Sequence, residues 1–241
     1  MVGVGMFEYQ KWLRIFDYKN IDNFLKSEKG KGEIVPAVIV VLVTGLLAAI
    51  PSLIGSILYL TILAPSLQAA SPGVDPLQYF PSFIGGSPLL TTLVMALAGL
   101  IFAPVFFLLG NFVTHQAAIM LGGKGEYKHL VYLNSHIVAA TNIFMFVYNT
   151  LSIILSIVPC LGLLSCPLLI TAIAVFIYML YVYLKSIMIN YGLAQNQALM
   201  ALGAYLVYCI VLVAIIFVIE YFLYLKPIFD KLSALESAGL F

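Results

Sequence analysis

Charged residues are scarce in this chain. Only 9% of its 241 residues are Asp, Glu, Lys or Arg, whereas 63% are hydrophobic. An average soluble domain carries about 25% charged residues, so a water-soluble protein of this length would lack the side chains that cover its surface. The composition excludes a soluble enzyme and a disordered chain, and it predicts an integral membrane protein. The net charge of +1 gives no basic surface for nucleic acid, so no nucleic-acid partner is expected.

Cysteine is nearly as rare. The three cysteines, Cys160, Cys166 and Cys209, are too few for a disulfide scaffold and form no CxxC pair. Cys160 and Cys166 lie in a short segment between two prolines, Pro159 and Pro167. Two alternatives are open for them, a disulfide across a turn or two free thiols.

Sequence signatures of catalysis are missing as well. The chain has no GxSxG or HExxH motif, and its apolar runs contain no pair of carboxylates for acid–base work. His115, His129 and His136 flank one loop, but their spacing matches no metal-binding pattern. We therefore predict a protein that is not an enzyme and that has no catalytic residue, no cofactor and no metal site.

Long segments without charge mark the membrane spans. Charged residues are absent between Glu33 and Asp75, between Asp75 and Lys124, between Lys128 and Lys185, and between Lys185 and Glu220. A helix needs about 20 apolar residues to cross the hydrocarbon core. Divided at their prolines and glycines, these segments predict five spans, at residues 34–63, 89–121, 134–158, 167–189 and 198–225.

The predicted fold is all-α, an integral membrane bundle of five transmembrane helices with an amphipathic amino-terminal helix. Backbone polar groups in lipid must bond within their own segment, which favours helices. The domain division is an amphipathic segment at 1–33, the five-span domain at 34–225 and a short tail at 226–241.

The basic residues predict the orientation. With five spans, all but two of the eleven Lys and Arg residues lie on one side of the membrane; only Lys226 and Lys231 lie on the other. The positive-inside rule places the basic side in the cytoplasm. We therefore expect a multi-pass protein of the cell membrane with its amino terminus inside and its carboxyl terminus outside.

Apolar residues in the amino-terminal segment recur at helical spacing. Tyr9, Trp12, Leu13 and Phe16 follow the i, i+3, i+4, i+7 pattern, which predicts one or two amphipathic helices. Such a helix either lies on the cytoplasmic lipid surface or packs against the end of its own bundle. In the first alternative, Trp12 and Phe16 face lipid or a partner.

The loop LGGKGEYKHL, residues 121–130, contains glycines and lysines after the second span. It lacks the spacing of a phosphate-binding loop, and we interpret it as a tight turn at the membrane interface. Lys124 and Lys128 in this loop, and Lys185 in the next one on the same side, are expected to face lipid headgroups or a protein partner.

Polar residues within the predicted spans suggest an alternative function. Ionisable groups inside a membrane are costly and are usually functional. A transporter or channel subunit would use Asn111, His115, Asn142, Asn149 and Glu220 around an inner path, with His136 as a further proton carrier. The other interpretation places His115, His136 and Glu220 near the two membrane interfaces, where they need no such role.

Two segments resemble a known family. LGGKGEYKHL and YLKSIMINYGLAQNQALMAL, residues 183–202, together with five closely spaced spans, are similar to the Yip-domain family, named for Ypt/Rab-interacting proteins. Lys185, Gly192, Leu193, Ala198 and Leu199 match the family's pattern before the last span, and the match is closer to its prokaryotic members. The family often has a proline early in the third span, where this chain reads HIVAATNI.

The resemblance implies a non-enzymatic role in membrane organisation or trafficking, or as an accessory scaffold for other membrane proteins. The expected partners are the lipid bilayer, a membrane or cytoplasmic protein, or a second copy of the chain. The cytoplasmic face would carry the function.

The orientation is testable by labelling. Single cysteines placed in the two terminal tails of a chain without its native cysteines should react with an impermeant maleimide from opposite sides of the membrane. An even number of spans would make both tails react from the same side, which would refute the predicted topology.

Overall fold

The computed structural model describes residues 9–63, 65, 88–157 and 165–222. Two short helices, α1 (Tyr9–Arg14) and α2 (Ile21–Glu28), precede five long ones. The long helices are α3 (Ile34–Leu58), α5 (Pro88–Met120), α6 (Tyr127–Ile157), α7 (Ser165–Tyr191) and α8 (Gln195–Glu220). A π-helical turn, η1 (Tyr59–Leu63), follows α3 directly.

Each of the five long helices is long and apolar enough to cross a membrane. The predicted all-α bundle with five spans is therefore confirmed. The helices exceed some predicted limits, most of all α6, which begins at Tyr127 rather than at 134. Helix α3 continues through Pro51 and α5 through Pro104. The predicted tail at 226–241, and nearly all of the predicted loop between the first two spans, lie outside the described residues.

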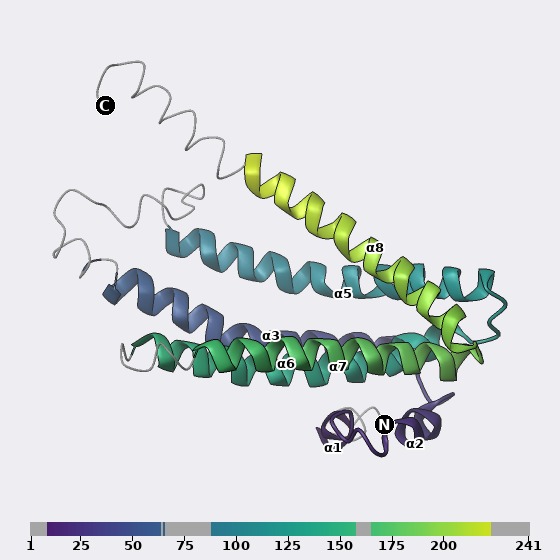
Figure 1. The fold of residues 1–241 in the computed structure, drawn as a ribbon. Coiled ribbons are helices and arrows are strands. Elements are labelled where there is room, and N and C mark those ends of the chain that lie inside the picture. Colours follow the sequence, from purple (N-terminus) through teal and green to yellow (C-terminus); the bar gives the residue numbers. More distant parts are fainter. Residues whose placement is uncertain (1–8, 64, 66–87, 158–164, 223–241) are drawn as a thin grey trace.

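The long helices form two layers. Helix α3 packs along α6, and α6 packs along α7; α5 and α8 pack against each other beside them (Figure 1). One end of the bundle is formed by the start of α3, the turn from α5 to α6 and the turn from α7 to α8. We name it the hairpin end, because α1 and α2 lie beside it, and we name the opposite end the far end.

Burial differs sharply between the two ends. The largest apolar cluster joins Ala118, Leu130, Ile187 and Ala198 from four different helices, all fully buried and all near the hairpin end. Toward the far end, by contrast, the five consecutive residues from Ile215 to Ile219 are all exposed. A helix exposed on every side in a chain of this hydropathy has lipid as its solvent.

Glycines in the left-handed region end two of the spans at the hairpin end. Gly122 (φ 89°) follows α5, and Gly192 (φ 67°) follows α7. The N–H of Gly123 reaches back to the carbonyl of Ala118 at 2.9 Å, the bond expected where a helix closes on such a glycine. Both spans therefore end in short turns that keep the next helix close.

Helices α1 and α2 form a helical hairpin, here called the amino-terminal hairpin. It lies on one side of the bundle, alongside the hairpin-end halves of α6 and α7 (Figure 1); α1 contacts α6, and α2 contacts α7. The sequence predicted one or two helices here, and there are two.

The turn at Gly125 is packed too tightly to accept a side chain. A Cβ at this position would lie 2.5 Å from the carbonyl oxygen of Asn190. We expect Gly125→Ala to lower the free energy of unfolding in detergent by about 1–3 kcal/mol, the usual cost of overpacking. Gly99→Ala is the matched control, because a Cβ there meets nothing within 4 Å. Equal stability of the two variants would contradict this packing.

Candidate functional site

The amino-terminal hairpin buries its apolar face against the bundle. Trp12, only 7% exposed, packs with Val40 of α3 and Ala139 of α6. Ile15, Ile21, Phe24 and Leu25 enter the main core cluster with residues of α6 and α7. The sequence left two alternatives for this segment, the lipid surface or the end of its own bundle. In the structure the segment packs against the bundle. The expectation that Trp12 faces lipid or a partner is wrong, because protein covers its indole.

A buried carboxylate fixes the hairpin to the bundle. Glu28, at the end of α2, is only 5% exposed. It accepts hydrogen bonds from Lys11 Nζ of α1 at 3.1 Å, Lys31 Nζ at 3.3 Å and the Tyr132 hydroxyl of α6 at 3.0 Å. A buried charge is stable only when such partners replace water. Glu28 therefore links α1, α2 and α6 at one point.

The environment of Glu28 controls its ionisation. Burial by itself raises the pKa of this carboxyl, but the hydrogen bonds from Lys11, Tyr132 and Lys31 outweigh burial and hold the pKa below its ordinary value of 4.5. The charged form is therefore the one that the folded hairpin favours.

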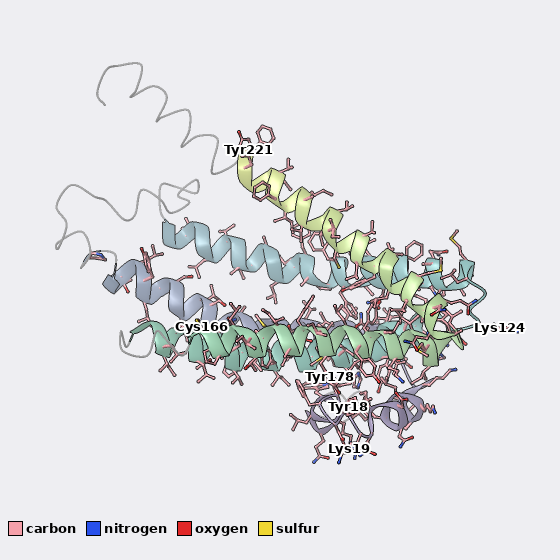
Figure 2. The ribbon with its side chains drawn as sticks, viewed as in Figure 1. Tyr18, Lys19, Lys124, Cys166, Tyr178 and Tyr221 are labelled. Atoms are coloured by element: carbon pink, nitrogen blue, oxygen red, sulfur yellow. The ribbon has the colours of Figure 1, made fainter. Side chains whose placement is uncertain are left out.

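Helix α7 supplies three further contacts to the hairpin. The Lys185 ammonium lies 3.1 Å from Asp22 Oδ2 and over the Tyr181 ring. Lys29 Nζ donates to the carbonyl of Ile189 at 2.7 Å, and the Tyr178 hydroxyl donates to the carbonyl of Ile15. Figure 2 shows Tyr178 and Tyr18 at this junction. Lys185, expected to face headgroups or a partner, is instead engaged within the protein.

The outer surface of the hairpin combines apolar and basic side chains. Leu13, Phe16 and Tyr18 are 53%, 38% and 67% exposed. Lys19, on the turn between α1 and α2, points away from the bundle (Figure 2), and Arg14 is also exposed. That Phe16 faces lipid or a partner stays a prediction. This mixture is typical of helices that lie at a membrane interface.

A pocket of about 470 Å³ opens on this hairpin. Its lining residues come from the end of α1, the turn and α2: Arg14, Asp17, Asn20, Asn23, Phe24 and Ser27. Sequence reasoning missed this pocket, because it depends on how the turn places the end of α1 beside α2. Five of its six lining side chains are polar or charged, so it is suited to a polar ligand.

The two loops at the hairpin end contact each other. The Lys124 N–H donates to the carbonyl of Tyr191 at 3.1 Å, and Asn190 Nδ2 donates to the carbonyl of Glu126 at 3.1 Å. Lys124 is exposed at this turn (Figure 2). Lys128 is exposed but lies 2.9 Å from Glu126, and their hydrogen bond lowers the pKa of Glu126. The loop that follows α5 is thus in direct contact with the end of α7.

Three asparagines of α6 bond to side chains of other helices. Asn134 of α6 donates to Asn111 of α5 at 2.9 Å. Asn142 and Asn149, both on α6, donate to Thr44 and Ser52 of α3 at 3.1 and 3.2 Å. The structure thus brings Asn111, Asn142 and Asn149 into separate pairs along α6 rather than into one group.

The histidines and the acidic residue of the suggested path lie apart. His115 Nδ1 lies 2.7 Å from the Tyr191 hydroxyl near the end of α5, whereas His136 is buried beneath the hairpin, beside the Phe24 ring. Glu220 ends α8 at the far end, and its side chain lies outside the described residues. Within the described ranges, no three His, Cys, Asp or Glu residues group as a metal site.

The cysteines add no chemistry to the hairpin. Cys166 is an exposed free thiol at the far end (Figure 2). Cys160, and with it the alternative of a disulfide, lies outside the described residues. Cys209 is a partly buried free thiol within α8.

The Tyr132 hydroxyl gives a direct test of the Glu28 linkage. Tyr132→Phe should weaken docking of the hairpin by about 2 kcal/mol, the worth of a hydrogen bond to a charged group. Hydrogen exchange of α1 and α2 amides would measure it. Tyr18→Phe is the control, since that ring is largely exposed. Equal exchange in both variants would contradict the role of Glu28.

The lowered pKa of Glu28 sets the pH dependence of docking. Because the folded-state pKa is depressed, the contribution of Glu28 is complete above pH 4.5 and is lost as the pH falls through the lower, folded-state value. Protection of the hairpin amides, measured relative to the intrinsic exchange rate at each pH, should therefore fall in acid. Glu28→Gln should flatten this dependence; an unchanged profile would assign the acid response to another group.

Comparison with known proteins finds no family model, no curated protein and no solved structure that matches this chain.

Proposed function

We propose that this multi-pass protein is a non-enzymatic membrane-organising or accessory scaffold of the Yip-domain type, and that it acts through its hairpin end on the cytoplasmic leaflet. The observation that carries the proposal is the docked amino-terminal hairpin. The bundle holds the exposed apolar and basic side chains of the hairpin in a fixed position. An amphipathic segment that was not docked could bind the membrane without the bundle.

The depth of the hairpin along α7 supports a place at the leaflet boundary. Helix α7 has 27 residues, about 40 Å at 1.5 Å per residue, against a hydrocarbon core of about 30 Å. The contact of Tyr178 with Ile15 lies thirteen residues before Tyr191, or about 20 Å from the helix end. If the hydrocarbon core begins at the first residue of α7, its other boundary lies about 30 Å along this helix. The contact at Tyr178 then lies about 10 Å inside that boundary, which is the depth at which an interfacial helix is buried.

The bonding of the span residues favours a scaffold over a transport path. Each amide of Asn134, Asn142 and Asn149 bonds a side chain of a neighbouring helix. Hydrogen bonds of this kind hold transmembrane helices together. An ion path instead needs polar groups that turn toward a common, hydrated space.

The two segments on which the proposed family type rests lie together at the hairpin end. Residues 121–130 and 183–202 are far apart in the sequence, yet Lys124 contacts Tyr191, and Gln197 Nε2 donates to the carbonyl of Leu121 at 3.1 Å.

Proteoliposomes provide the test. The purified chain should change the shape of vesicles, and Leu13→Ser/Phe16→Ser should remove about half of that effect, because both lost side chains contribute apolar area at the interface. Electron microscopy of the vesicles measures it. Met120→Ser is the control, because Met120 is 86% exposed at the same end but lies outside the hairpin.

The same vesicles separate the scaffold from a transporter. The proposal predicts no flux of protons, ions or small solutes above that of empty vesicles. Two results together would overturn the proposal and support the transport alternative: the chain produces a flux that Asn111→Ala abolishes, and it leaves the shape of the vesicles unchanged.

A further inference from the structure

Two opposite charges face one pocket on the hairpin without pairing to each other. Arg14 and Asp17 both line the cavity of about 470 Å³ between α1 and α2. Asp17 accepts a hydrogen bond from Asn20 Nδ2 at 2.9 Å. Within the described ranges, the Arg14 guanidinium and the Asn23 amide have no ion-pair or hydrogen-bond partner. The pocket therefore presents an unused cation and unused amide groups beside a carboxylate.

These groups select the chemistry of a ligand. A guanidinium binds phosphate oxygens with paired, charge-assisted hydrogen bonds. A carboxylate next to it attracts an ammonium group and disfavours a second anion. Phe24, almost fully buried, adds one aromatic ring to the lining, whereas a quaternary ammonium is usually held by a cage of several. The lining thus suits a phosphate joined to a primary ammonium.

The surroundings of the pocket identify the source of such a group. Leu13 and Phe16, on either side of Arg14 in the sequence, are exposed apolar side chains, and the hairpin lies at the depth of the leaflet boundary. A soluble phosphate compound would gain nothing from these apolar neighbours. A lipid would place its headgroup in the pocket and its acyl chains along them.

We propose that this pocket binds the headgroup of a phospholipid with a primary amine, with Arg14 contacting the phosphate and Asp17 the ammonium. The inference rests on the proposed place of the hairpin at the leaflet and names the lipid that it would select. It makes the hairpin a lipid-specific contact rather than a general basic surface.

Binding of short-chain lipids to the full-length protein in detergent tests the pocket. Native mass spectrometry would compare phosphatidylethanolamine, phosphatidylglycerol and phosphatidylcholine. Arg14→Gln should weaken binding of the first two lipids by about tenfold, the effect of one lost charged hydrogen bond. Asp17→Asn should weaken binding of phosphatidylethanolamine by about tenfold and leave binding of phosphatidylglycerol unchanged or tighter. The asparagine keeps an acceptor for Asn20, so the turn is preserved.

Two further variants complete the test. Lys19→Gln removes a charge of the same hairpin that does not line the pocket, and it should change no affinity. Asn23→Lys should shift the preference toward phosphatidylglycerol, because it adds a cation beside Arg14. Equal losses in the Lys19 and Arg14 variants, or equal effects of Asp17→Asn on both lipids, would overturn the proposal.

Soluble competitors distinguish the source of the phosphate. Phosphoethanolamine and inorganic phosphate should compete only weakly, since they lack acyl chains. Competition as strong as that of the lipid would overturn the lipid assignment. Because binding is measured in detergent, its failure leaves the vesicle-shape result, and so the proposed function, to be judged separately.

Discussion

The burial of one carboxylate organises the amino-terminal half of this molecule. Glu28 cannot leave water without replacement donors, and its donors come from α1, from the chain after α2 and from α6. Meeting that requirement orients both helices of the hairpin at once. Their apolar faces then turn toward the bundle, and Leu13, Phe16 and Arg14 are left on the outside.

The same requirement explains why the hairpin end is the better packed part of the protein. The ends of the spans leave unpaired carbonyl groups and carry polar side chains such as Asn134 and Asn190. The amide NH2 groups of Asn134 and Asn190 donate to partners on neighbouring helices and loops, which requires close approach, and Gly125 is tight for this reason. At the far end, apolar side chains in lipid make no comparable demand.

The sequence predicted the spans well and the hairpin only partly. Gaps between charges locate membrane crossings because the cost of burying a charge in lipid is large. The predicted start of α6 is too late, since Lys128 and His129 resemble loop residues although they lie on the helix. An apolar stripe containing Trp12 shows that a face is covered, but lipid and protein satisfy it equally.

Long-range pairing accounts for what the sequence could not show. Glu28 stands in a run of charged residues, where a carboxylate exposed to water is the ordinary expectation. Its burial depends on Lys11 and Tyr132, which donate hydrogen bonds to it from distant parts of the sequence. The pocket depends in the same way on how α1 and α2 are placed against α6 and α7. Amphipathic periodicity gives no information on either contact.

The exposed stretch of α8 gives lipid a structural role in this protein. Every residue from Ile215 to Ile219 is exposed in the part of the chain that the structure describes, so acyl chains act there as a packing partner. Membrane thickness and tail order would then tune the tilt of this helix, while the glycine-tight turns at the opposite leaflet stay fixed.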